Sequence, residues 1–174
     1  MGGVGEREPC LDYEDFVRAT WHRPPQHWLP GGRCPGGLRN PPVIWMPWRD
    51  ANVYARWAGK VLPTARQWEK AACGPKRRAY TWGEKPAAAK CNTAESGIGS
   101  ATPVARYQSG VSLYGVRDLR GNVREWRSTP CADGPDRHEL SGAAFSSPFV
   151  RAAPALENAA NSSMKDNGTG FRCS

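Results

Sequence analysis

Glycine and proline interrupt this chain so often that long regular elements are excluded. The 174 residues include 19 glycines and 16 prolines, and the segment HRPPQHWLPGGRCPGGLRNPP, residues 22–42, is especially rich in both. Proline lacks a backbone N–H and fixes φ, and glycine loses the most backbone entropy on ordering, so both end helices and strands. The chain also holds 8 tryptophans, too aromatic a composition for disorder. A loop-rich α+β fold is therefore expected instead of a helix bundle.

Length and charge set further limits. A chain of 174 residues can bury a core but is short for two domains, so we expect one domain over residues 1–174. The formal net charge is +8, yet the basic residues gather only at residues 76–78, in a segment expected to be a solvated loop, so nucleic acid is not an expected partner. No apolar run approaches bilayer length and no signal peptide is visible. We therefore expect no membrane span and a cytoplasmic or phage-borne protein.

Two helices are predicted after Pro47. The first ends at Gly59, a residue that readily adopts the left-handed conformation common after a helix. The second begins after Thr64, whose hydroxyl can form a reciprocal capping box with the Gln67 side chain, and it ends at Gly74.

The other expected elements are shorter. Asp12 is expected to cap a helix through DYEDFVRAT. Residues 43–45 favour a short strand, and the segments TPVARY, SLYGVRDL and GNVREW favour short β pieces between turns. The segment 22–42 is expected to form an ordered loop, because Trp28 and Leu29 give it apolar side chains to bury.

From residue 42 onward, several short motifs follow one another in a specific order. They are PVIWMPWRDANVYARWAGKVLPTARQWEKAACG, YTWGEK, CNT, TPVARYQSGVSLYGVRDLRGNVREW and a terminal GFRC. This order resembles the formylglycine-generating-enzyme family, a branch of the C-type-lectin-like fold, and the upstream DFVRATWHRPPQHW is similar to that family's entry region. The resemblance implies an α+β, C-type-lectin-like domain with two helices and short antiparallel strands.

The resemblance also implies where catalysis would take place. In the enzymes, two cysteines between the GNxWEW segment and the terminal GFR bind copper and oxidise a substrate cysteine, because thiolates suit a soft metal. Residues 132–172 of this chain contain no cysteine, so we expect no copper and no catalysis. The spacing of the cysteines fixes no disulfide pairing. The six cysteines are Cys10, Cys34, Cys73, Cys91, Cys131 and Cys173.

Two structural calcium sites are implied by the same resemblance, since hard cations prefer carboxylate and carbonyl oxygens. An alternative for the first site is that Glu125 pairs with a nearby arginine. In the second site Ser96 stands where an aspartate is usual, and Glu95 could substitute for it. The first set is Glu125 with the carbonyl oxygens of Arg120, Gly121 and Val123, and the second is Asn92 with those of Thr93 and Ile98.

The segment from about residue 140 to 170 resembles a diversified ligand surface. In the variable proteins of diversity-generating retroelements, which are similar to this family, Asn codons near the C-terminus are randomised at adenines while the closing GFR is kept. Glu157, Met164 and Lys165 do not derive from Asn codons by adenine change alone, so they would be fixed positions. The expected contact residues are Ala144, Ser146, Ser147, Phe149, Pro154, Leu156, Asn158, Ala160, Asn161 and Asn167.

Three functions remain open at this level. The first is a non-catalytic module that binds a macromolecular ligand, with protein as the expected class. The second is an oxidoreductase, either a copper enzyme with unusual ligands or a relative of the iron-dependent sulfoxide synthases. The third is a degenerate structural domain whose Ala, Ser and Asn residues only fill a solvated loop.

Overall fold

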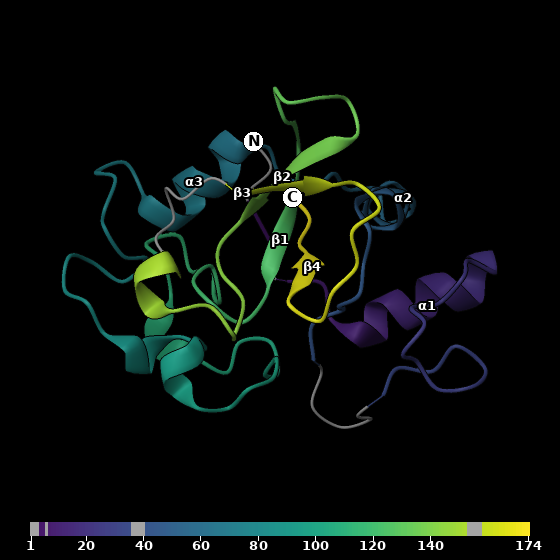
Figure 1. Ribbon diagram of the computed structural model, residues 1–174, viewed down its shortest axis with the longest axis horizontal. Helices are drawn as coiled ribbons and strands as arrows, with labels where there is room; N and C mark the ends of the chain where they lie inside the picture. Colours follow the sequence, from purple (N-terminus) through teal and green to yellow (C-terminus); the bar gives the residue numbers. More distant parts are fainter. Residues whose placement is uncertain (1–3, 6, 36–40, 153–157) are drawn as a thin grey trace.

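The computed structural model describes residues 4, 5, 7–35, 41–152 and 158–174, and a small mixed sheet lies at its centre (Figure 1). In the described residues the sheet has four strands in the order β3-β2-β1-β4. The neighbours β1–β2 and β2–β3 are antiparallel, whereas β1 and β4 run parallel. The strands are β1 (Arg124–Pro130), β2 (Arg137–Ser141), β3 (Asn158–Asn161) and β4 (Thr169–Phe171).

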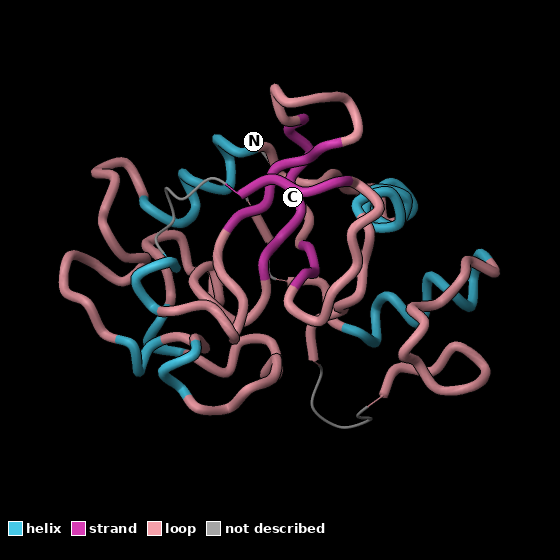
Figure 2. Tube along the Cα trace, viewed as in Figure 1, coloured by secondary structure: helices cyan, strands magenta, loops and turns pink. Residues whose placement is uncertain are grey.

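Helices surround this sheet, and long loops connect them (Figure 2). The helix α3 packs against β1 and β2, and α2 packs against β1 and α1. The α-helices are α1 (Cys10–Thr20), α2 (Trp48–Trp57) and α3 (Ala65–Cys73), and the 3₁₀ helices are η1 (Ala88–Lys90), η2 (Ala94–Ser96), η3 (Gln108–Gly110) and η4 (Phe149–Ala152).

The predicted start and stop signals of α3 are confirmed. The Gln67 backbone N–H donates to the Thr64 hydroxyl at 3.2 Å, and the Gln67 side chain accepts from the Thr64 N–H at 2.8 Å. The helix ends directly before Gly74, which has a φ of 68°. These contacts are local, which is why the sequence revealed them.

Other predicted elements differ in the structure. The cap of α1 is Pro9, and Asp12 lies inside the first turn. Residues 43–45 form no strand, because Trp45 has a left-handed φ of 59° and breaks the extended backbone. TPVARY and SLYGVRDL also form turns, with a left-handed φ of 62° at Ala105. Only GNVREW contributes a strand, the beginning of β1.

An aromatic core joins α1, α2 and β4. Tyr54 stacks on Tyr13 at 5.3 Å between ring centroids and meets Phe171 edge-on, also at 5.3 Å. Trp28 is 8% exposed and packs edge-on against Tyr13 at 5.9 Å, as expected for an ordered loop, whereas Leu29 is 49% exposed. The proline-rich loop is thus held on the core through one of the two side chains proposed for that role.

The two ends of the described chain lie close together. The Gly5 N–H donates to the Cys173 carbonyl oxygen at 2.9 Å, and Ser174 pairs with Val61 through two backbone hydrogen bonds of 2.9 and 3.2 Å. Arg7 and Arg172 form an isolated antiparallel bridge. This pairing brings two arginines that are far apart in the sequence to the same end of β1.

Candidate functional site

A buried charge cluster, formed by Glu125 with Arg7 and Arg172, lies at the start of β1. Glu125 is 0% exposed, and Arg7 and Arg172 are 1% and 0% exposed. Arg172 donates to both carboxylate oxygens, from Nε at 2.6 Å and from Nη2 at 2.7 Å. Arg7 donates from Nε to Oε1, and the Trp68 indole donates to Oε2 at 2.6 Å. Every ionised group in the cluster therefore has a partner of opposite charge.

The two guanidinium groups decide the ionisation of Glu125. Burial alone would raise its pKa, but the charges of Arg172 and Arg7 outweigh burial and hold the pKa at about 2. The carboxylate is consequently ionised at neutral pH and is too well paired to act as a general base.

Arg7 also reaches the carbonyl oxygens expected in the first calcium site. Its Nη2 donates to the carbonyl oxygens of Gly121 and Val123, at 3.0 and 2.9 Å. The alternative that Glu125 pairs with an arginine is therefore confirmed. Calcium at this set stays a prediction, and the ion would have to displace the guanidinium from oxygens that it already satisfies.

The residues of the second expected calcium site belong to a polar network. The Asn92 amide nitrogen donates to Asn122 Oδ1 at 3.1 Å, and Asn92 Oδ1 accepts from the Ser96 hydroxyl at 2.8 Å. Thr93 is fully buried, whereas Ile98 is exposed. Calcium at this second set likewise stays a prediction. In the described part of the chain, no group of three or more His, Cys, Asp or Glu side chains is arranged to hold a metal ion.

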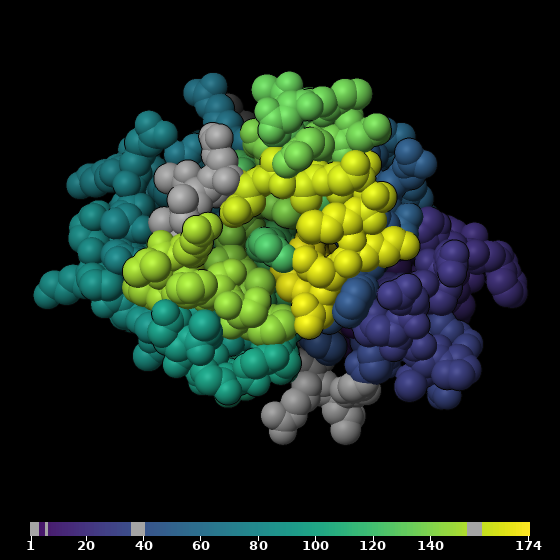
Figure 3. Space-filling model, in the orientation of Figure 1, coloured from purple at the N-terminus to yellow at the C-terminus, as the bar shows by residue number. Residues whose placement is uncertain are grey.

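The expected contact residues fall into three groups. Those in the described ranges lie mostly on one face, where residues 146–152 in lime green and residues 158–167 in yellow meet (Figure 3); we call these two ranges the C-terminal surface. Ala144 is only 1% exposed and lies under Gly168, so its assignment as a contact residue is wrong.

Pro154 and Leu156 lie outside the described residues. Ser146, Asn161 and Asn167 are exposed, and Ser147, Phe149, Asn158 and Ala160 are half-buried.

The first half of the C-terminal surface is held from below by η2. The Glu95 carboxylate accepts from the Phe149 N–H with both oxygens, at 2.9 and 3.0 Å. This hydrogen bond lowers the pKa of Glu95. The Ala94 N–H donates to the Ser147 carbonyl oxygen at 3.0 Å. Glu95, considered above as a calcium ligand, thus orders the backbone at Phe149.

An aromatic cluster, consisting of Tyr80, Trp82 and Phe149 around Arg120, supports the same segment. The Phe149 ring is stacked with Tyr80 at 5.6 Å. The Arg120 guanidinium carbon lies 4.2 Å from the Tyr80 ring centroid and 4.7 Å from that of Phe149. Sequence reasoning missed this cluster because its members come from three separate segments, although the YTWGEK motif contains two of them.

The second half of the C-terminal surface rests on the sheet. The strand β3 pairs along β2, with Ala160 opposite His138. After β3, the Asn161 side chain accepts from the Ser163 N–H at 3.0 Å, and Asp166 forms a 2.6 Å ion pair with Arg124. Met164 packs against the main core, which fits its expected role as a fixed position.

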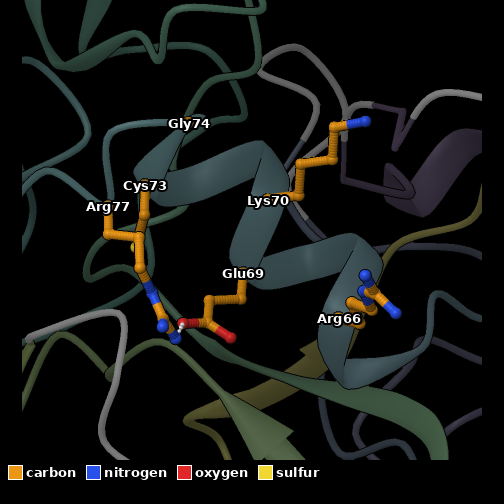
Figure 4. Close-up of a pocket in the computed structure, with 6 residues that line it drawn as sticks. All are labelled: Arg66, Glu69, Lys70, Cys73, Gly74 and Arg77. Atoms are coloured by element: carbon orange, nitrogen blue, oxygen red, sulfur yellow. Dashed lines mark hydrogen bonds and ion pairs between the residues drawn. The ribbon is translucent and has the colours of Figure 1, made fainter.

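The cysteines are all free thiols in the structure. Burial raises the pKa of Cys91 to about 11 and also raises that of Cys73. Cys73 lines an open pocket of about 370 Å³ on α3, where Glu69 and Arg77 point toward one another and form a 2.9 Å ion pair (Figure 4). Because the Cys73 thiol stays protonated and the Glu69 carboxylate is paired with Arg77, this pocket has no activated nucleophile or base.

The α+β arrangement is that of the C-type-lectin-like fold of the formylglycine-generating enzymes: PvdO from Pseudomonas aeruginosa matches with a TM-score of 0.74 and 20% identity over 92% of this chain and 74% of that chain. Treponema denticola variable protein 1 matches with a TM-score of 0.77 and 14% identity over 97% of this chain and 81% of that chain. A family described as the sulfatase-modifying factor enzyme 1-like domain, FGE-sulfatase, matches residues 4–174, so the chain belongs to this family.

Relatives in this family include active and inactive proteins. The formylglycine-generating enzyme of Streptomyces coelicolor is 39% identical over 63% of this chain and 38% of its own length. The hercynine oxygenase of Mycolicibacterium smegmatis is 34% identical over 72% of this chain and 32% of its own length. The inactive C-alpha-formylglycine-generating enzyme 2 of Mus musculus is 34% identical over 76% and 52%. The chain thus spans about a third of the length of the first two relatives.

No described helix has the length and apolar character needed to cross a bilayer.

Proposed function

We propose that this chain is a non-catalytic binding protein that presents a diversified C-terminal surface to a macromolecular ligand, most plainly another protein. The function belongs to the exposed positions Ser146, Asn161 and Asn167 together with the half-buried ring of Phe149. Small polar side chains lose little rotamer freedom on binding, and an aromatic ring can supply a large share of the contact energy.

The observation that carries the proposal is the composition of residues 132–172, which contain no cysteine. In the enzymes that this chain resembles, the copper-binding thiols lie in this interval. Serine hydroxyls do not ionise near neutral pH and are poor ligands for Cu(I). The nearest thiols by sequence are Cys131 and Cys173, and burial raises the pKa of Cys173.

The way the surface is attached supports the same function. Glu95, the aromatic cluster and β2 hold the backbone of the C-terminal surface from below, whereas its exposed side chains have few partners. A preordered backbone spares ordering entropy on binding. Side chains on such a base can be exchanged without disturbing the core.

Similar proteins supply a further argument. Treponema denticola variable protein 1 shares the fold over 97% of this chain. A protein named for its variability thus has the same fold, which supports a variable surface on this chain. The competing function is oxidation, because the hercynine oxygenase and the formylglycine-generating enzyme are relatives.

Two measurements test the proposal. The first is the DNA around the gene: a near-copy of the last forty or so codons that differs mainly at adenines, near a reverse transcriptase gene, is expected. An isolated gene without such a copy contradicts diversification.

The second measurement is turnover. The purified chain, loaded with Cu(I) or Fe(II) and supplied with oxygen, is incubated with a cysteine-containing peptide beside the Streptomyces coelicolor enzyme as a positive control. No conversion is expected from this chain, and formation of formylglycine would overturn the non-catalytic assignment.

A further inference from the structure

A second exposed aromatic surface lies at the C-terminal end of α1, at the opposite end of the long axis from η4 (Figure 1). Trp21 follows the last residue of α1 and is 92% exposed. Its φ of 58° is left-handed, a conformation that glycine adopts without strain and a bulky residue adopts at a cost. The Trp21 indole therefore contributes nothing to the core, and its left-handed backbone conformation is unfavourable. An exposed residue kept at such a cost indicates a binding role.

A pocket of about 610 Å³ lies beside this indole. We call it the Trp21 pocket. Its walls are the last turns of α1, the segment that follows Trp21 and a turn at residues 31–33, and Val17 and Pro24 give it apolar lining. Its volume is within the usual range for sites that bind small molecules.

The lining of the Trp21 pocket is cationic. It contains Arg18, Arg23 and Arg33 but only one carboxylate, Glu14. Both oxygens of Glu14 are engaged, one with Arg18 at 3.0 Å and the other with the Cys34 N–H at 3.0 Å. Among the described residues, the side chains of Arg23 and Arg33 form no hydrogen bond or ion pair. Two guanidinium groups are thus available for an anion.

Backbone contacts hold the walls in place. The Leu29 N–H donates to the Arg33 carbonyl oxygen at 3.0 Å, and the Gly32 N–H donates to the Leu29 carbonyl oxygen at 3.2 Å. A Cβ on Gly32 would lie 3.2 Å from Val17, so the turn sits directly on α1. On the other wall, His22 lies 3.5 Å from Asp50 and its ring contacts Phe16. The pocket is consequently formed before any ligand arrives.

We propose that the Trp21 pocket binds a nucleoside phosphate, with the base stacked on the Trp21 indole and the phosphates paired with Arg23 and Arg33. An exposed tryptophan offers a flat face to a heterocycle, and guanidinium groups pair with phosphate oxygens through two parallel hydrogen bonds. The arginines surround one pocket and do not extend as a basic stripe, which suits a single nucleotide better than a nucleic-acid strand.

Isothermal titration calorimetry of the full chain with ADP tests this inference. Sub-millimolar binding that weakens with added salt is expected, with adenosine and inorganic pyrophosphate each binding more weakly than ADP. The substitutions Trp21→Gly and Arg33→Gln are each expected to weaken ADP binding by about tenfold. Trp21→Gly should leave the melting temperature unchanged or raise it, because glycine accepts the left-handed φ.

Matched controls separate binding from folding. Arg66→Gln removes an exposed arginine in the pocket on α3, and Trp57→Phe alters another partly exposed indole. Both variants are expected to retain ADP binding. The inference is overturned if ADP does not bind at millimolar concentration, if pyrophosphate binds as well as ADP and Trp21→Gly has no effect, or if only an oligonucleotide or an acidic peptide binds. None of these outcomes bears on the C-terminal surface, whose function is tested separately.

Discussion

The buried charge cluster and the C-terminal surface are both rich in polar side chains, but they are constrained in opposite ways. Glu125 is fully buried and accepts four hydrogen bonds from side chains of Arg7, Arg172 and Trp68. Asn161 and Asn167 are exposed, and the Asn161 side chain accepts hydrogen bonds from Ser163, only two positions away. Loss of Glu125 from the first region would leave two buried guanidinium groups without a carboxylate, whereas the second region can exchange side chains at little cost.

The largest expected effect is at the charge cluster. Glu125→Ala leaves two buried guanidinium groups without their carboxylate and is expected to lower the free energy of unfolding by about 3–5 kcal/mol. Urea denaturation measures the change, with Glu84→Ala, at an exposed position, as the control. Equal losses in the two variants would show that the cluster is not the more constrained region.

Acid should remove the same stabilisation. The folded pKa of Glu125, about 2, lies below its ordinary value of 4.5, so its ionisation stabilises the folded state above that value, and the contribution is lost as the pH falls toward 2. As the pH falls from 4.5 to about 2, the free energy of unfolding is therefore expected to decrease, and to decrease less steeply in Glu125→Gln. Identical pH profiles of the two proteins would assign acid sensitivity to other carboxylates.

Arg120 connects the aromatic cluster to the C-terminal surface, so its removal should have an intermediate effect on the free energy of unfolding. Arg120→Met loses the contacts with the rings of Tyr80 and Phe149, and it also loses a hydrogen bond to the Phe149 carbonyl oxygen at 3.3 Å. We expect a loss of about 2 kcal/mol and faster hydrogen exchange in residues 149–152. Arg106→Met, at an exposed position, is the control, and unchanged exchange would separate Arg120 from the surface.

A smaller effect is expected at Met164, which packs against the core from within the C-terminal surface, as Ala160 also does. Met164→Ala removes a half-buried side chain and should cost about 1–2 kcal/mol, measured by thermal or urea unfolding. A loss no greater than that of Asn167→Ala would mean that Met164 is as exchangeable as its neighbours.

The smallest effects are expected at the exposed asparagines. Asn161→Ala and Asn167→Ala should each change the free energy of unfolding by less than about 0.5 kcal/mol, because neither side chain is buried. Larger losses would contradict the view that the surface tolerates exchange.

Features whose cause is local could be predicted from the sequence. The capping box of Thr64 and Gln67 and the end of α3 at Gly74 depend on neighbouring residues and were correct. The extended segment predicted at residues 43–45 failed because long-range hydrogen bonds, such as that from Trp45 to the Asp166 carbonyl oxygen, override local β propensity.

The candidate site shows the same division. The terminal GFR motif and the absence of cysteine from residues 132–172 were readable. The sequence could not identify Arg7 as a partner of Glu125, because the two residues lie 118 positions apart. The burial of Ala144 was also missed, since it depends on contact with Gly168 from a separate segment.

The position of Arg172 has a consequence for synthesis. This arginine follows Glu125 by 47 residues, so a ribosome must extend the polypeptide well past β1 before the carboxylate can meet its second cation. Partly made chains therefore lack one of the two guanidinium groups that satisfy the buried carboxylate, and they should remain open until translation passes the GFR motif. Products that stop earlier would be readily recognised by proteases.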